Sequence, residues 1–236
     1  MPNLTIASFN AHWGLTPDST PFDLVAACAG FGTDLIALQE VWNPEGEPAT
    51  LAHWAEQAGY HLTEAPLADS FVDPRPEITR DRSLARGTWG IALLSRLPVR
   101  SVEIVDLGRL PGPWDLARRV AVLADVDVEG SSVQVAAIHL SFMVPNAIAQ
   151  LRTLRRLLPK DRATVIVGDC NLWGPAVAGL VGRRRAVRGR TWPAHRPHSQ
   201  LDHILVSGQL DLVRGEVLPE AGSDHRPIRA TLEVDG

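Results

Sequence analysis

The chain has 236 residues, of which 45% are hydrophobic and 21% charged, as expected for a globular protein that buries a core. Its net charge of −4 excludes a general electrostatic attraction to nucleic acid or to an anionic membrane. The two cysteines, Cys28 and Cys170, form no CxxC pair and no larger framework, so they give no indication of a disulfide scaffold or a zinc cluster.

The N-terminal residues Met1 to Thr5 have neither a basic region nor a long apolar stretch, so they do not resemble a signal peptide. No uninterrupted apolar run is long enough to span a bilayer. We therefore expect a cytoplasmic protein without a transmembrane segment, and we expect it to be a monomer.

The first part of the chain alternates predicted strands and helices. Apolar spacing predicts strands over residues 4–9 and 34–39 and helices over residues 22–31 and 49–59. Residues 64–88 are rich in Pro, Asp and Arg and show little periodicity, which predicts a long loop.

Strand patterns then follow in close succession, and their short separations favour antiparallel pairing. The expected strands are residues 90–95, 101–107, 120–128 and 133–140. Beyond them we expect a helix over 147–158, a strand over 164–168, an irregular segment over 172–200, and strands over 203–206, 210–217 and 227–234. No repeat or linker interrupts this order, so we expect one domain over residues 1–236.

Polar residues interrupt the chain where the apolar strands begin or end. These residues are Asn10, Glu40, His139, Asp169, Asn171, Asp202, Asp224 and His225. Strand ends on a rigid scaffold present side chains to a common rim. Carboxylate and amide oxygens suit Mg²⁺ or Mn²⁺, and histidines add acid–base capacity. Taken singly, each has an ordinary structural explanation: a turn, a solvated strand edge or a hydrogen-bonded core histidine.

Taken in order, these segments resemble the endonuclease/exonuclease/phosphatase superfamily, which includes deoxyribonucleases, abasic-site endonucleases, neutral sphingomyelinases and inositol-polyphosphate 5-phosphatases. The most specific segments are Gly168-Asp169-Cys170-Asn171 and Ser223-Asp224-His225-Arg226-Pro227. The others are Ser8-Phe9-Asn10, Leu38-Gln39-Glu40, residues 90–95, Ile138-His139-Leu140 and residues 201–206. Family members often have Phe where this chain has Cys170.

The resemblance implies an α/β fold of the α+β kind, a four-layer sandwich of two packed, mostly antiparallel β-sheets flanked by helices. It also implies a Mg²⁺ site, with Mn²⁺ as the alternative ion, formed by Glu40 with help from Asn10 and Asp224. Asp169 is expected to orient or deprotonate the attacking water, and Asn171 to donate to a phosphate oxygen. Asp202 is expected to hold the ring of His225, while His225 and His139 contact the phosphoryl group.

The function expected from this resemblance is that of a Mg²⁺-dependent phosphoester hydrolase, a phosphodiesterase or phosphatase in which a metal-assisted water attacks phosphorus. A nuclease acting on DNA or RNA is the alternative. A catalytically inactive binding module of the same fold is a third possibility, but no expected ligand or base is missing. The substrate is expected to be a small molecule, a lipid headgroup or a nucleic acid.

Further residues are candidates for contacting the substrate through their place in the sequence. They are His12, Arg119, Arg183, Arg184, Arg185 and Trp192. The arginine loop, which lies between Asn171 and Asp202, is expected to border the site as a solvated loop, and binding of a polyanion by its basic cluster is the alternative. For His12 and Trp192, loop packing and core packing are the alternatives to substrate contact.

Overall fold

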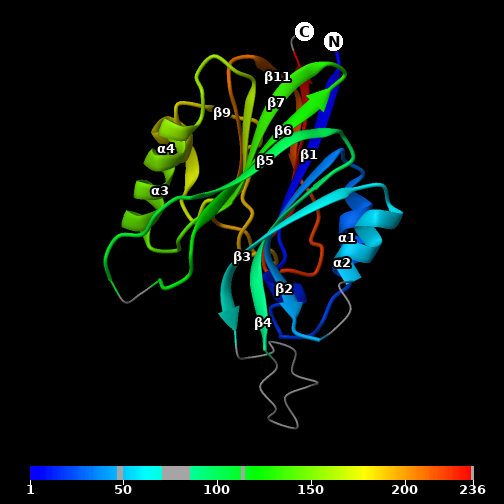
Figure 1. Cartoon of the computed structure of the whole chain (residues 1–236). Coiled ribbons are helices and arrows are strands. Elements are labelled where there is room, and N and C mark those ends of the chain that lie inside the picture. The colour runs from blue at the N-terminus through cyan, green and yellow to red at the C-terminus, as the bar shows by residue number, and fades with distance from the viewer. Residues whose placement is uncertain (47–49, 71–85, 113–114, 235–236) are drawn as a thin grey trace.

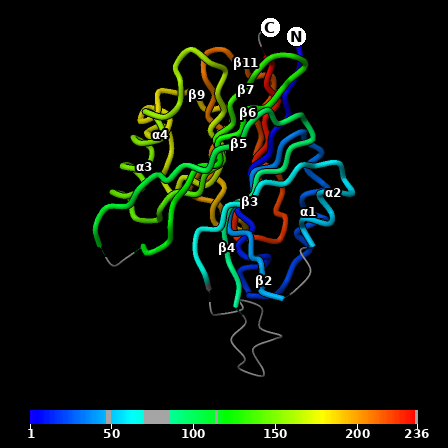
Figure 2. The backbone as a smooth tube through the Cα atoms, in the orientation of Figure 1, coloured from blue at the N-terminus to red at the C-terminus, as the bar shows by residue number. Residues whose placement is uncertain are grey.

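A computed structural model describes residues 1–46, 50–70, 86–112 and 115–234, which form two six-stranded β-sheets packed face to face. Helices cover the outer face of each sheet (Figure 1). The backbone trace shows both chain ends at the same end of the sandwich (Figure 2). This arrangement confirms the expected four-layer α/β sandwich.

The first sheet combines the two ends of the sequence. Its strand order is β11-β12-β1-β2-β4-β3, and every neighbouring pair is antiparallel except β1 and β2. The strands are β1 (Asn3–Asn10), β2 (Leu35–Pro44), β3 (His61–Ser70), β4 (Gly87–Ser95), β11 (Leu210–Val217) and β12 (Ile228–Val234).

The second sheet is formed by the middle of the sequence. Its strand order is β5-β6-β7-β8-β10-β9, and only β7 and β8 run parallel. The strands are β5 (Val99–Asp106), β6 (Val120–Val128), β7 (Ser131–His139), β8 (Thr164–Asp169), β9 (Arg184–Arg185) and β10 (Asp202–Val206). The expected antiparallel pairing of the middle strands is therefore confirmed.

Three buried clusters correspond to the three interfaces between the four layers. One lies between the sheets, where Ile6 and Leu35 of the first sheet share a cluster with Val135 and Val167 of the second. The other two lie under the helices on the outer faces. The helices are α1 (Leu24–Phe31) and α2 (Thr50–Gln57) on the first sheet, and α3 (Val144–Leu157) and α4 (Gly174–Val181) on the second.

The ends of helix α1 show how local sequence sets an element boundary. The Asp23 carboxylate accepts a hydrogen bond from the Ala26 N–H (2.8 Å), which caps the first turn. Gly32 ends the helix in the left-handed region, with φ of 60°. Helix α1 thus begins two residues after the start expected from apolar spacing.

The two parallel pairs determine where the polar strand ends meet. In a parallel pair both strands end at the same edge of the sheet, so Asn10 lies opposite Gln39 and His139 opposite Asp169. Strand β10 runs the other way and begins with Asp202 opposite Asp169. Residues far apart in sequence are therefore brought to one edge of the sandwich.

The pairing of strand β4 with each of its two neighbours, β2 and β3, changes register near Gly90. The register with β2 shifts between Leu38 and Val41, and the register with β3 shifts between Pro66 and Ala68. A Cβ atom at Gly90 would overlap the Ala65 carbonyl oxygen, so this close approach requires glycine. Beyond Gly90 the three strands continue as an extension of the sheet (Figure 1).

The prediction of irregular structure over residues 64–88 and 172–200 was partly wrong. Residues 64–70 belong to β3 and residues 87–88 to β4, while 71–85 lie outside the described residues. Pro66 weakens the strand pattern, but an edge strand tolerates proline at a bulge. Within 172–200, the structure has helix α4 and the two-residue strand β9. Helix α4 has a proline in its first turn and is capped by Gly182. Because these residues are also typical of loops, the helix was not recognised in the Gly/Pro-rich sequence.

Among the helices in the described part of the chain, none combines the length and the hydropathy that crossing a bilayer requires.

Gly168→Ala is expected to lower the free energy of unfolding by about 2–5 kcal/mol. Gly168 has φ of 143°, and a new Cβ would overlap the Ile138 carbonyl oxygen across the parallel pair. Gly182→Ala is the matched control, because Gly182 also has positive φ (66°) but faces open space. The control change should cost about 1–2 kcal/mol. Denaturant unfolding measures both, and equal losses would contradict the predicted overlap.

Candidate active site

The polar residues at the strand ends converge at the edge where the two sheets meet. The side-chain amide of Asn10, at the end of β1, donates to Glu40 Oε1 (3.2 Å) and to Asp169 Oδ2 (3.1 Å). Asn10 and Glu40 belong to the first sheet and Asp169 to the second. The Asn10 side chain thus joins the two sheets within the site.

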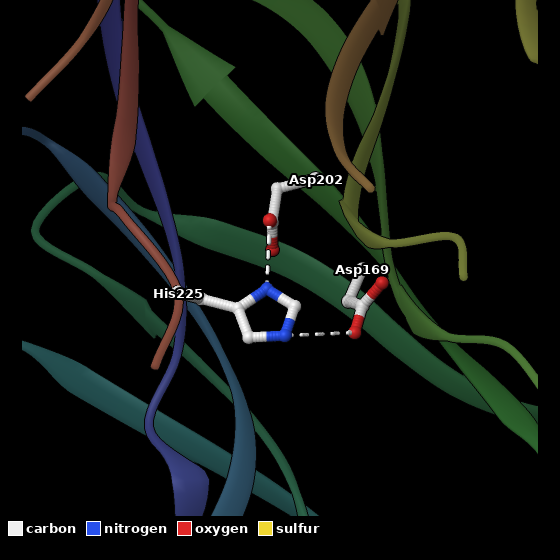
Figure 3. Close-up of side chains that lie close together, drawn as sticks. All are labelled: Asp169, Asp202 and His225. Atoms are coloured by element: carbon white, nitrogen blue, oxygen red, sulfur yellow. Dashed lines mark hydrogen bonds and ion pairs between the residues drawn. The ribbon is translucent and has the colours of Figure 1, made fainter. Parts of the chain in front are cut away.

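Two imidazoles approach the Asp169 carboxylate from different strand ends. His139 Nε2 lies 3.7 Å from Asp169 Oδ2 and 3.7 Å from Glu40 Oε1. His225 Nε2 lies 4.0 Å from the same Asp169 oxygen. On the far side of its ring, His225 Nδ1 hydrogen bonds to Asp202 Oδ2 at 2.9 Å (Figure 3). Asp202 thereby fixes the orientation of the His225 ring.

The segment that carries His225 is attached directly to the end of strand β1. The Ser223 hydroxyl donates to the Asn10 carbonyl oxygen (2.7 Å) and accepts a hydrogen bond from the His225 N–H (3.1 Å). This explains why serine precedes Asp224 and His225: its hydroxyl joins the loop before β12 to the strand that provides Asn10.

Three residues at or beside the site have positive φ although they are not glycines. Glu40 has φ of 52°, Asn171 of 50° and His12 of 43°. Such conformations cost of order 1–3 kcal/mol each and are characteristic of functional sites. The turn at Asn171 lets its backbone N–H donate to Asp169 Oδ1 (2.8 Å), while its side-chain amide donates to the Leu140 carbonyl (2.9 Å).

The two histidines have opposite proton affinities. Burial lowers the pKa of His139 well below its ordinary value, and the charges of Arg119 and His225 lower it further. Burial also acts to lower the pKa of His225, but the charge and hydrogen bond of Asp202 outweigh it and raise that pKa to about 10. His139 is therefore neutral near pH 7, and His225 is an imidazolium.

The carboxylates of Asp169 and Glu40 are both made more basic by burial. Burial raises the pKa of Asp169 to about 7, with the positive charge of His225 opposing the rise and the negative charge of Asp202 adding to it. Burial likewise raises the pKa of Glu40, against the hydrogen bond from Asn10. Asp169 can therefore exchange a proton near neutral pH.

A second group of expected site residues lies beside Glu40. Asp224 Oδ2 accepts a hydrogen bond from Trp192 Nε1 (3.1 Å), and Asp224 Oδ1 lies 3.9 Å from His12 Nδ1. The charges of His12 and Asp224 both act on the Glu40 carboxylate. The structure thus brings His12, Trp192 and Asp224 together on the Glu40 side of the site.

The carboxylates and His225 also offer ligand atoms for a cation. One oxygen each from Asp169 and Asp202 and a ring nitrogen of His225 lie within 4.8 Å of one another, so this buried group could hold a metal ion. The side-chain oxygen of Asn10 accepts a hydrogen bond from the His12 N–H (3.0 Å). In this arrangement, the Asn10 side chain positions Glu40 and Asp169 through its nitrogen.

Arg119 is buried behind His139 and does not face solvent. Its guanidinium pairs with the buried Asp115 carboxylate (3.1 Å) and donates to the His139 carbonyl oxygen (3.5 Å). It also lies over the Trp89 ring, which contacts the ring of His139 edge-on. The sequence offered no signal for Asp115 or Trp89 beyond the spacing of Asp115 four residues before Arg119.

Arg183, Arg184 and Arg185 are not brought to the site. Arg184 pairs with Val206 and Arg185 with Leu205 across β9 and β10, whereas Asp202 lies at the opposite end of β10. Residues 186–201 carry the chain back to the site, and β10 then runs from Asp202 at the site to Val206 beside Arg184. The expected position beside the site therefore does not hold for them.

Solved structures of similar fold align with almost the whole length of this chain. An endonuclease/exonuclease/phosphatase from Beutenbergia cavernae DSM 12333 has a TM-score of 0.78 at 22% identity, covering 100% of this chain and 72% of that one. D. rerio TDP2 complexed with a single-strand DNA product has a TM-score of 0.66 at 18% identity, covering 98% and 99%. The mannosyl-6-phosphatase Bt3783 of Bacteroides thetaiotaomicron VPI-5482 has a TM-score of 0.66 at 14% identity, covering 98% and 99%.

The comparison with curated proteins gave no match. Residues 7–225 match the sequence model of the Endonuclease/Exonuclease/phosphatase family, a span that begins within strand β1, ends at His225 and leaves out β12. The chain therefore belongs to the Endonuclease/Exonuclease/phosphatase family.

Proposed function

We propose that this protein is a Mg²⁺-dependent phosphoester hydrolase in which a metal-assisted water attacks phosphorus. The observation that carries the proposal is the position of Asp169. Its carboxylate is buried between two imidazoles and the Asn10 amide, and its pKa is raised to about 7. A base of that strength can take a proton from a water near neutral pH.

The residues present fit a hard divalent cation on the Glu40 side of the site. Glu40 is largely buried, its pKa is raised by burial, and the negative charge of Asp224 lies close enough to raise it further. Two carboxylates in a buried setting favour a cation that takes oxygen ligands. We assign the ion to Glu40 and Asp224, with Asn10 as a further oxygen donor if its amide is turned toward them. When bound, Mg²⁺ would offset negative charge on the phosphoryl oxygens.

Each of the remaining site residues has its own role in the proposed hydrolysis. Asp169 orients the attacking water and accepts its proton. The His225 imidazolium, held by Asp202, directs its Nε2 N–H toward the centre of the site, where it stabilises negative charge on a phosphoryl oxygen. Neutral His139 contacts the phosphate from the side of Glu40. Asn171 donates a hydrogen bond to a phosphate oxygen from the opposite side.

A largely apolar pocket is lined by chain neighbours of the metal-side residues, and we assign the organic part of the phosphoester to it. Its volume is about 510 Å³, and its lining includes Trp13, Phe22 and Trp42. Trp13 follows His12 in the chain, and Trp42 lies two residues beyond Glu40 on β2. The indole N–H of Trp42 is buried and has no hydrogen-bond partner in the described part of the chain.

A nuclease is the second candidate function. TDP2, a structural neighbour, is described in complex with a single-strand DNA product, and another neighbour is a mannosyl-6-phosphatase. The pocket lined by Trp13, Phe22 and Trp42 offers aromatic side chains on which a nucleobase can stack.

Removing the divalent cation is expected to abolish hydrolysis, and Glu40→Gln is expected to weaken cation binding. Replacing a carboxylate by an amide removes the charge that attracts the ion while keeping the shape of the side chain. Isothermal titration with Mg²⁺ and Mn²⁺ measures the binding, and rates with and without chelator measure the activity. Full activity in excess chelator would contradict the proposal. Glu64→Gln, an acid on the rim of the apolar pocket, is the matched control.

Asp169→Asn and His225→Ala are each expected to lower kcat by about 10²–10⁴-fold, because a positioned base or charge donor contributes about that much. Asp202→Asn should lower kcat by a similar factor, since it loses the negative partner of the His225 ring. It should also shift the pH profile to lower pH. Thermal unfolding shows whether each variant is folded. Folded variants with near-parental rates would disprove these roles.

Trp13→Ala is expected to raise KM about tenfold for an aryl phosphodiester, because the aromatic contact contributes about 0.5–1.5 kcal/mol beyond area burial. KM for the corresponding methyl phosphodiester should change little, which makes the substrate pair its own control. Steady-state rates with both substrates test the assignment. An equal rise in KM for the two substrates would mean that the pocket does not hold the organic group.

A further inference from the structure

We propose that the end of the second sheet opposite the catalytic residues carries a separate binding surface for the phosphate backbone of a nucleic-acid strand. This basic surface comprises Arg155, Lys160, Arg183, Arg184, Arg185 and Arg188. It goes beyond the proposed hydrolase function and does not depend on it.

The charge of the protein is distributed unevenly along the sequence. Residues 152–190 contain ten of its 23 Lys and Arg residues but only two of its 27 Asp and Glu residues. One of those acids, Asp169, is buried in the catalytic site, so Asp161 is the exposed acid of this segment. A protein with a net charge of −4 therefore has a strongly positive region, and the fold gathers much of it on one surface.

Two adjacent hollows shape this surface. A hollow of about 360 Å³ is lined by Arg155, Lys160 and Arg183, where the ends of α3 and α4 meet the turn after β10. A hollow of about 590 Å³ is lined by Arg183, Arg184, Arg185 and Arg188. Arg183 lines both, so the two hollows are neighbours. Among the described residues that line them, none carries a carboxylate.

Neutral groups hold several of these arginines in place. Arg183 donates to Thr164 Oγ1 (3.1 Å) and to the Pro159 carbonyl (2.8 Å), and Arg155 donates to the Leu180 carbonyl (3.3 Å). Because these acceptors are uncharged, they orient the guanidinium groups without neutralising them. Arg184 has a carboxylate neighbour, Asp211, at 3.6 Å, but both side chains are more than half exposed and their attraction is screened.

The positively charged side chains of this surface also repel one another. Burial lowers the pKa of Arg183, and the positive charge of Arg155 lowers it further. An anion bound between them would relieve that repulsion. Planar guanidinium groups recognise phosphate with two parallel hydrogen bonds, which suits arginine to this ligand.

The shape favours a chain of phosphates over a lipid bilayer. Two neighbouring hollows that share Arg183 can take successive phosphates of one strand, whereas a bilayer presents a flat surface to protruding groups. The surface is also remote from the chemistry. Arg184 lies opposite Val206, and Asp202 lies four residues of strand away, about 13 Å at ~3.3 Å per residue. A strand bound here would be held without taking part in catalysis.

The test compares two charge-reversed double variants. Lys160→Glu with Arg188→Glu changes one residue in each hollow, and both side chains are exposed and lack partners among the residues that the structure describes. Arg96→Glu with Arg100→Glu is the control for total charge, since it makes the same charge change at the start of β5, the opposite edge strand of the same sheet, where Arg100 pairs with Asp127. Thermal unfolding establishes that both variants are folded.

Binding of a fluorescein-labelled oligothymidylate is measured by anisotropy as a function of salt, with chelator present so that no hydrolysis occurs. The parent and the control should bind with the same salt dependence. The variant with reversed charge in the hollows should bind at least tenfold more weakly, with a log–log salt slope smaller by about 1.4, or about 0.7 for each lost phosphate contact. Because no turnover is measured, failure of the hydrolase proposal would not affect this result.

Equal affinity of all three proteins for the oligonucleotide would overturn the proposal and place nucleic-acid binding elsewhere. Absence of oligonucleotide binding would also overturn it. Vesicles of phosphatidylcholine with phosphatidylglycerol are measured in parallel by co-sedimentation. Binding to these vesicles alone, lost in the variant with reversed hollow charges, would show that the basic surface serves a membrane instead.

Discussion

The hydrogen bond from the Asn10 amide to the Asp169 carboxylate is the contact on which the site depends, because it joins the two sheets. The first sheet supplies Asn10 and Glu40, and the second supplies His139, Asp169 and Asp202. Neither sheet holds a complete set. The cluster between the sheets fixes their relative position, so the apolar residues of the central layer control distances between polar groups at its edge.

Burial gives the polar residues of this edge their chemical differences. In a low-dielectric setting each charged group responds strongly to its neighbours. His225 has Asp202 at 2.9 Å and becomes an imidazolium, while His139 has the guanidinium of Arg119 nearby and stays neutral. Two residues of the same type therefore offer a charged donor and an uncharged contact within one site. The buried pair of Asp115 and Arg119 maintains that difference from behind.

Much of the fold and the convergence of the polar strand ends could be predicted from the sequence. Asn10, His139 and Asp169 each end a strand, as the sequence pattern predicted, whereas Glu40 lies at the bulge within β2, which continues to Pro44. The roles assigned to these residues remain proposals. Strand β3 was missed because Pro66 masks its pattern, and an edge strand with a bulge is set by its neighbour rather than by its own residues.

Tertiary contacts account for the other differences. The partner of Arg119 depends on how the segment before β6 folds against the sheet, and local spacing does not specify this. The place of Arg184 and Arg185 depends on the direction of two short strands, and a pattern of two residues carries no direction. Helix α4 has only eight residues, too few for a clear apolar period.

The two register shifts at Gly90 separate the strands of the first sheet into two parts. On one side, β2, β3 and β4 pair within the core. On the other, Val41–Pro44, Ala68–Ser70 and Gly87–Gly90 pair with one another beyond it. Because an alternating strand reverses its faces when its register changes by one residue, an insertion normally disturbs everything downstream. Here the bulges already interrupt the alternation. The extension can therefore lengthen or shorten during evolution while the core strands keep their faces.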